Sequence, residues 1–304
     1  MRRCLTAARI AALLLGLPLI MYWAGREAAL VGGWNFGIVF GILLSQAAML
    51  IYALRFRLVV GLVGIQLGLL ETLRIATLGL FYQCFVPFAA GSDLTKFVKL
   101  KARKHGTLAS AAGIVLDHLL GVCALTLLAV TLAGAYRPLE LTVDPRFGAA
   151  LAIAIATLAA LILRWLDHSG RVPAVRAALR VLRKQRRGVG LAVAAALATY
   201  MLLAAAVWSA ARGSGLETDY PTILFVLSAT SVLQAVPAQL LGIGVAELAA
   251  TALYVAVGHS PAAAVLLTSF MVGYRLLMAL IGGLWDLGPV DLSLFGAVAP
   301  VRRP

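Results

Sequence analysis

Residues 82–93 read YQCFVPFAAGSD, and they interrupt an apolar stretch that is otherwise long enough to cross a membrane. Proline removes a backbone donor from a helix and glycine permits a turn, so Pro87 and Gly91 are expected to break and shape the chain there. Non-helical backbone at membrane depth is tolerated only where it is buried in protein or lines a cavity. The stretch 66–90 is therefore predicted to be a re-entrant hairpin and not a plain crossing.

Residues 233–247 read LQAVPAQLLGIGVAE and repeat this order of features. A glutamine precedes a Val-Pro, glycines follow, and an acidic residue stands at the expected start of the next helix. The residues that shape this second break are Pro237, Gly242 and Gly244. The flanking charges place the ends of 66–90 on one side of the membrane and those of 220–257 on the other. Two hairpins that enter from opposite faces are the layout of an inverted-repeat transporter; two unrelated helix breaks are the alternative.

The composition places the whole chain in a membrane. Apolar residues make up 62% of it and charged residues 12%, whereas soluble domains are near half apolar and a quarter charged. No series of ten-residue alternating segments is present, which argues against an outer-membrane barrel. Spanning helices are predicted near residues 10–24, 36–54, 107–134, 147–164, 189–211 and 262–285. The predicted fold is all-α: a polytopic membrane protein with about six spanning helices and two oppositely oriented re-entrant helical hairpins.

We expect a single integral membrane domain over residues 1–304. Its first half is 1–135, with the hairpin 66–90, and its second half is 188–304, with the hairpin 220–257. Residues 136–187 are expected to hold an outer loop, a linking helix and a basic cytoplasmic segment.

The distribution of basic residues predicts the orientation. Twenty of the 26 Lys and Arg residues fall on one side when the N-terminus is placed in the cytoplasm, as the positive-inside rule requires. We therefore expect a multi-pass protein of the cell inner (cytoplasmic) membrane with both termini cytoplasmic and a first helix that is retained. In this arrangement Arg55 and Arg57 mark the cytoplasmic end of the second span. The net charge of +14 reflects this topology, so no nucleic acid partner is expected.

The segment 167–187 is predicted to form a basic amphipathic helix. Val172, Val175, Leu179 and Leu182 recur at helical spacing, and arginines occupy the other faces. Such a helix suits the surface of an anionic leaflet. It could also serve as the docking surface for a partner enzyme, or simply as a topology anchor.

Charged groups inside apolar segments are the candidate site residues, because each costs about 2.5–3.5 kcal/mol at the membrane centre and needs a partner or water. Asp93 and Lys96 follow the first break, where a helix start can hold an anion; Asp93 acting only as a cap is the alternative. Glu247 is likewise a site residue or the third residue of a capped helix. The full set of expected substrate-binding residues is Gln83, Asp93, Lys96, Asp117, His118, Gln234, Glu247 and Arg275.

Arg275 lies near the middle of its predicted helix, too far from either end to reach water. Its guanidinium suits a lipid phosphate, and a structural ion pair with Glu247 or Asp117 is the alternative. Asp117 and His118 are adjacent and so face different sides of their helix; His118 is a proton relay or an internal hydrogen-bonding group.

Glu71 and Arg74, three residues apart, are expected to pair with each other. No phosphate loop, metal-spaced His pair or nucleophile elbow is present, so no cofactor, metal or enzymatic activity is expected.

Two signatures in the chain resemble those of a known family. The first runs from Phe85-Val86-Pro87 through Gly91-Ser92-Asp93 to Lys96 and continues at Leu116-Asp117-His118-Leu119-Leu120-Gly121. The second contains Val236-Pro237, Gly242-Ile243-Gly244-Val245 and Glu247, and ends at Tyr274-Arg275-Leu276. In this order, over roughly residues 35 to 285, they resemble the lysylphosphatidylglycerol synthase transmembrane region, also called flippase-like.

The resemblance implies a membrane protein that handles lipids. Ser92 stands where glycine is common in the family, Lys96 and His118 where arginine is common, and Ala246 where arginine often precedes the glutamate. These departures reduce the cationic groups available to a headgroup, so a substrate different from that of better-known members is expected. The chain shows no soluble aminoacyl-transfer domain, and lysyl transfer is not expected.

Three functions follow from these observations. The first is a flippase for an amphiphile with an anionic headgroup, such as a modified phospholipid or a polyprenyl-phosphate-linked sugar. The second is a non-catalytic membrane subunit that supports a lipid-modifying or glycosyl-transfer enzyme. The third is a proton-coupled transporter of a small solute that uses Asp117 and His118.

Overall fold

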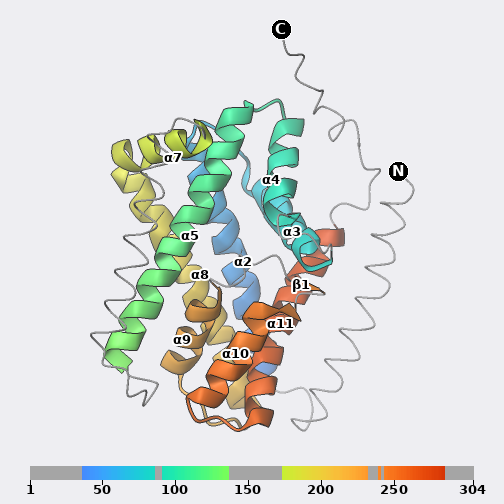
Figure 1. Cartoon of the computed structure of the whole chain (residues 1–304). Coiled ribbons are helices and arrows are strands. Elements are labelled where there is room, and N and C mark those ends of the chain that lie inside the picture. Colours follow the sequence, from blue (N-terminus) through green and yellow to red (C-terminus); the bar gives the residue numbers. More distant parts are fainter. Residues whose placement is uncertain (1–35, 86–90, 137–172, 232–238, 241–242, 285–304) are drawn as a thin grey trace.

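The computed structural model describes residues 36–85, 91–136, 173–231, 239–240 and 243–284, and this part of the chain is almost entirely helical (Figure 1). The predicted spans near 10–24 and 147–164 lie outside the described residues. Four of the described helices are long and apolar enough to cross a membrane: α2 (Phe36–Leu62), α5 (Thr107–Tyr136), α8 (Arg186–Gly213) and α11 (Pro261–Leu284). They confirm the predicted spans 36–54, 107–134, 189–211 and 262–285, and with them an all-α polytopic membrane protein.

Helix α2 corrects one prediction. The sequence places its end near residue 54, with Arg55 at the cytoplasmic boundary, but the helix continues to Leu62. Arg55 is 5% exposed within it. The predicted helix end is too early, because the apolar residues Val59, Val60 and Leu62 allow the helix to continue past Arg55.

Both predicted interruptions fall between helices. The first separates α3 (Leu69–Phe85) from α4 (Gly91–Ala102). The second separates α9 (Tyr220–Ser231) from a two-residue strand pair, β1 (Gln239–Leu240) and β2 (Ile243–Gly244), and from α10 (Val245–Ala256). Each short helix packs against the helix on the far side of its break. Helix α4 packs against α3 across the first break, so the helical pair around this break extends beyond the predicted boundary at residue 90. Pro87, Gln234, Pro237 and Gly242 lie outside the described residues.

Glycines allow the helices to approach closely. A Cβ at Gly91 would lie 2.9 Å from the carbonyl oxygen of Tyr82, so only glycine lets α4 start so close to the end of α3. A Cβ at Gly282 of α11 would lie 2.0 Å from the carbonyl oxygen of Thr77 in α3. Small residues serve this purpose in membrane helices generally. The contact of α3 with α11 and with β1 brings the two broken stretches side by side.

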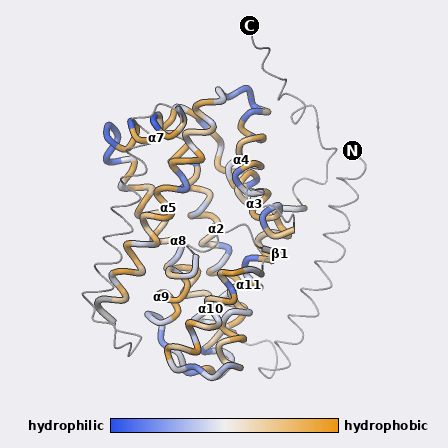
Figure 2. The backbone as a smooth tube through the Cα atoms, in the orientation of Figure 1, coloured by the Kyte–Doolittle hydropathy of each residue, from blue (hydrophilic) through white to orange (hydrophobic). Residues whose placement is uncertain are grey.

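The two ends of the molecule differ in polarity. Hydrophilic residues gather at the end that carries α7 (Pro173–Lys184) and the turn between α4 and α5 (Figure 2). Helix α7 forms within the predicted basic segment and faces the bundle with Val175 and Ala178. The exposed basic residues of this end include Lys101, Arg103, Lys104, Arg180, Lys184, Arg186 and Arg187.

Candidate functional site

A cavity of about 460 Å³ lies among the long helices and the two broken stretches. Its polar lining comes mainly from α2, α4 and α5. The apolar lining includes Met49, Leu80, Leu125, Leu203, Val207, Leu227, Met271 and Met278. The cavity is therefore amphiphilic; the charged lining residues of α2, α4 and α5 are called the charged wall, and these apolar residues the apolar wall.

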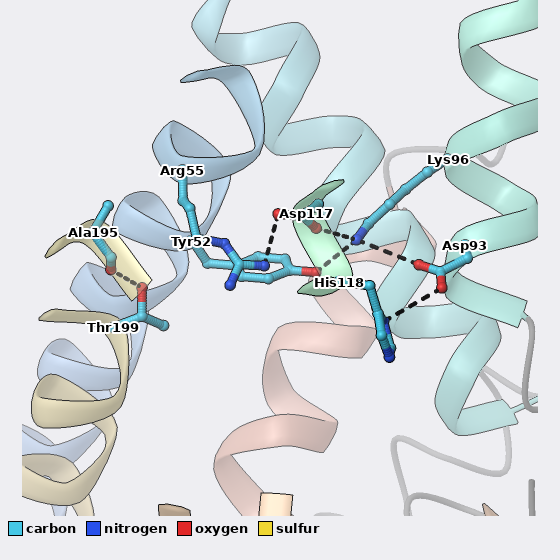
Figure 3. A network of polar contacts seen from close by, with 8 residues as sticks. All are labelled: Tyr52, Arg55, Asp93, Lys96, Asp117, His118, Ala195 and Thr199. Atoms are coloured by element: carbon cyan, nitrogen blue, oxygen red, sulfur yellow. Dashed lines mark hydrogen bonds and ion pairs between the residues drawn. The ribbon is translucent and has the colours of Figure 1, made fainter. Parts of the chain in front are cut away.

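The charged wall is built around Asp117 of α5. One of its carboxylate oxygens lies 2.8 Å from Nη2 of Arg55, and the other lies 3.2 Å from Nζ of Lys96 (Figure 3). Lys96 also donates a hydrogen bond of 2.9 Å to the hydroxyl of Tyr52. The three charged side chains are 3–6% exposed. Their ion pairs with one another therefore replace most of the contacts that they would otherwise make with water. Two buried cations share one buried carboxylate, which leaves this part of the wall with an excess of positive charge.

Aromatic rings and a glycine create the space for these cations. Nζ of Lys96 lies 5.0 Å from the ring centroid of Phe56, and the guanidinium carbon of Arg55 lies 5.0 Å from that of Tyr52. Both distances fit a cation over an aromatic ring. A Cβ at Gly121 would lie 3.0 Å from Nη1 of Arg55. The guanidinium of Arg55 thus occupies space that a residue larger than glycine at position 121 would take up.

A second, looser group of charges stands beside this wall. Asp93, in the first turn of α4, lies 3.8 Å from Nζ of Lys96 and 3.8 Å from Nδ1 of His118. The side chains of Asp93 and His118 are 42% and 55% exposed. A carboxylate in the first turn also complements the helix dipole. Asp93 therefore lines the cavity without being locked by a hydrogen bond to either cation.

In the second half of the chain, Arg275 and Glu247 form a closed ion pair. Nη1 of Arg275 donates to Oε1 of Glu247 over 2.5 Å, and both side chains are buried. Oε2 of Glu247 accepts a 2.7 Å hydrogen bond from the backbone N–H of Gly244, at the start of α10. The predicted pair and the predicted capping role of Glu247 are thus both present. Arg275 lines the cavity, and Glu247 stands behind it.

The structure brings six of the eight predicted site residues to the cavity: Gln83, Asp93, Lys96, Asp117, His118 and Arg275. Glu247 reaches the site through Arg275, and Gln234 lies outside the described residues. Asp117 and His118 point to different partners, as their adjacency predicts. Glu71, expected to pair with Arg74, forms an ion pair with Arg103 at the end of α4.

Sequence reasoning missed Arg55, Tyr52, Thr199, Tyr200 and Tyr274, which also line the cavity. The signal for Arg55 was present: the apolar residues Val59, Val60 and Leu62 follow it and allow the helix to continue. The four neutral residues carry no comparable signal, because Tyr and Thr are common throughout membrane helices.

No metal site is found in the described ranges, where no group of three or more His, Cys, Asp or Glu side chains could hold an ion. The charged wall therefore has to be understood from its own ion pairs and from what enters the cavity.

The family model described as the lysylphosphatidylglycerol synthase TM region matches residues 7–284. No curated protein and no solved structure matches the chain.

Proposed function

The chain belongs to the lysylphosphatidylglycerol synthase TM region family, and we propose that it moves an amphiphilic lipid with an anionic headgroup across the membrane. Membership of this family indicates a lipid-related function in the membrane. The observation that carries the finer proposal is the amphiphilic cavity, because one wall suits a headgroup and the other suits acyl or prenyl chains.

The headgroup would bind at the charged wall. Arg55 and Lys96 supply cationic donors that share a single buried carboxylate, Asp117. A phosphate oxygen is the acceptor that a guanidinium and an ammonium group both favour. A modified phospholipid and a polyprenyl-phosphate-linked sugar each offer such an oxygen next to an apolar tail.

The tail would lie against the apolar wall. Met49, Leu80 and Met278 contribute side chains from α2, α3 and α11, and unbranched methionines adapt to chains of varied shape. A soluble solute would gain nothing from this wall, so the proposal favours a lipid over a small polar substrate.

The movement would come from the two halves, residues 1–135 and 188–304. In each half an acidic residue follows a break and contacts a basic residue on the next long helix: Asp93 with His118, and Glu247 with Arg275. This correspondence supports an inverted repeat with two re-entrant hairpins. Rocking of one repeat against the other would then expose the cavity to each side in turn.

The orientation is part of the proposal. The basic end, with α7 and the turn between α4 and α5, would face the cytoplasm, as the positive-inside rule predicts. The protein would then reside in the inner membrane with both termini cytoplasmic, and act as a transporter and not as an enzyme.

A transport assay tests the proposal. Val122 of α5 lines the cavity, whereas Leu127 of the same helix is 56% exposed on the outer surface. Val122→Trp would fill the cavity, and Leu127→Trp is the matched control. The purified chain is reconstituted in vesicles that contain an acyl-labelled fluorescent phospholipid, and dithionite quenching measures transbilayer movement.

We expect the wild type and Leu127→Trp to move the lipid, and Val122→Trp to slow it by about tenfold, the effect of roughly 1.4 kcal/mol of lost binding. Movement in wild-type vesicles no faster than in protein-free vesicles, or equal rates in the two tryptophan variants, would refute a lipid pathway through this cavity.

A second candidate function rests on the exposed basic end. Arg180, Lys184 and Arg187 project from the surface that carries α7, which suits an anionic leaflet or an acidic partner such as a lipid-modifying enzyme. The protein would then be a supporting membrane subunit. Replacing these three residues with Gln should release a co-purifying enzyme after gentle extraction; purification with no partner from the wild type counts against this role.

A further inference from the structure

We propose that the cavity selects a zwitterionic headgroup with one phosphate and one ammonium group, the phosphate at Arg55 and the ammonium group at Asp93. This inference rests on the proposed function: the anionic group of the headgroup is its phosphate, and an ammonium group is added to it. It follows from the two charged groups of the wall whose bonding capacity is unused.

The first such group is the guanidinium of Arg55. Its side chain is 6% exposed, and within the described residues its Nε has no hydrogen-bond partner. A buried donor without an acceptor is costly, and this one belongs to a cation that lines a cavity. A ligand oxygen with negative charge satisfies it best, because an arginine fork offers two parallel donors to a phosphate.

The second group is the carboxylate of Asp93. Nζ of Lys96 and Nδ1 of His118 both lie 3.8 Å from its oxygens, beyond hydrogen-bond distance. Among the described residues no side chain or backbone group donates a hydrogen bond to it. It is half exposed and lines the same cavity. An ammonium group of the ligand would therefore donate hydrogen bonds to the carboxylate oxygens of Asp93.

The groups between these two form ion pairs with each other, although Oδ1 of Asp117, like Nε of Arg55, has no hydrogen-bond partner within the described residues. Asp117 lies within 3.2 Å of both Arg55 and Lys96, and Lys96 donates to the hydroxyl of Tyr52. The wall therefore alternates in charge from Arg55 through Asp117 and Lys96 to Asp93, as Figure 3 shows. At one end of this series Nε of Arg55 lacks an acceptor, and at the other the carboxylate of Asp93 lacks a hydrogen-bond donor. A headgroup with one negative and one positive charge would complement both.

The alternatives fit this wall less well. An anionic headgroup without an amine would fill the site at Arg55 and leave the carboxylate of Asp93 with only its two 3.8 Å contacts to Lys96 and His118. A headgroup with two amines would bring one positive charge more than the wall can neutralise. The charge count thus favours a net-neutral phosphodiester, of which phosphatidylethanolamine is the simplest probe.

Calorimetric titration of the detergent-purified full chain tests this inference. The probes are dihexanoylphosphatidylethanolamine, dihexanoylphosphatidylglycerol and tail-free glycerophosphoethanolamine. Asp93→Asn removes the half-exposed charge with little change of shape. Glu217→Gln is the matched control, because Glu217 is exposed and stands outside the cavity.

We expect the wild type and Glu217→Gln to bind the ethanolamine lipid about tenfold more tightly than the glycerol lipid, as one charge-assisted contact provides. Asp93→Asn should lose this preference and keep its affinity for the glycerol lipid. Glycerophosphoethanolamine should bind much more weakly than either lipid.

Each other outcome is decisive. A glycerol lipid that binds the wild type as tightly as the ethanolamine lipid overturns the zwitterion inference and leaves the proposed function standing. A preference that persists in Asp93→Asn overturns the assignment to Asp93. Equal binding of the tail-free compound refutes a lipid as the source of the headgroup. No binding of any probe refutes the proposed function itself.

Discussion

Asp93 and His118 stand in the first half of the molecule where Glu247 and Arg275 stand in the second. In both halves the acidic residue lies in the first turn of the short helix after a break, and the basic residue precedes Leu-Leu in the next long helix. The second pair is closed at 2.5 Å and buried; the first is open at 3.8 Å and half exposed. Corresponding positions thus carry an acidic and a basic residue in both halves. The two side chains are buried and in contact in the second half, and separated and exposed in the first.

The difference shows how the two halves divide their roles. In the second half Glu247 and Arg275 join the start of α10 to the long helix α11, and we infer a structural role for this pair. In the first half Lys96, Asp117 and Arg55 make the buried contacts. Asp93 and His118 are therefore left at the cavity surface, where they can face a ligand.

The largest effect is expected from breaking the closed pair. Glu247→Gln leaves the buried guanidinium of Arg275 without its carboxylate, and we expect the free energy of unfolding to fall by about 3–5 kcal/mol. Unfolding of the purified protein in mixed micelles measures this loss. Adding Arg275→Met in the same chain should recover much of it, because an apolar residue needs no partner.

If Glu247→Gln is as stable as the wild type, the closed pair is not structural and the comparison fails. If the double variant is no more stable than the single one, the loss comes from the cap at Gly244 and not from the buried charge.

An intermediate effect is expected where the halves touch. Gly282→Ala would place a Cβ 2.0 Å from the carbonyl oxygen of Thr77, so α11 must move away from α3. Overpacking of this kind costs about 1–3 kcal/mol, measured by the same unfolding experiment. Gly61→Ala is the control, because no atom lies within 4 Å of the Cβ position there. Equal stability of the two variants would contradict a close contact between the halves.

The smallest effect is expected from the open pair. Asp93→Asn removes a carboxylate that is 42% exposed and makes only long ion pairs, so we expect a change of about 0–1 kcal/mol in the free energy of unfolding. A loss as large as that of Glu247→Gln would show that Asp93 is structural. It would also remove the basis for assigning Asp93 to a ligand.

The sequence predicts the long helices and the two breaks because both signals are local. An apolar run of about 20 residues indicates a crossing, and the Pro87–Gly91 and Pro237–Gly242 stretches indicate where helices end. The sequence also indicates Asp93 and Glu247 as candidate site residues, because a charge in or beside an apolar segment is costly unless it has a partner.

The burial of Arg55, the role of Glu247 and the distances within the charged pairs depend on contacts between residues that are far apart in the sequence. Arg55 follows an apolar run, where arginine usually marks the membrane boundary; its burial depends on Asp117, 62 positions away in the chain. The choice between a cap and an ion-pair partner for Glu247 could not be made from spacing, because the glutamate accepts from Gly244 N–H with one oxygen and from Arg275 with the other. Sequence spacing also gives no distance, so it cannot distinguish an open pair from a closed one.

The central claim is that the amphiphilic cavity holds a lipid, and native mass spectrometry of the gently extracted protein tests it most directly. The wild type and Leu127→Trp should each retain a phospholipid that survives removal of the detergent, and Val122→Trp should lose it. The same amount of bound lipid in all three proteins would place the lipid on the outer surface and contradict the account.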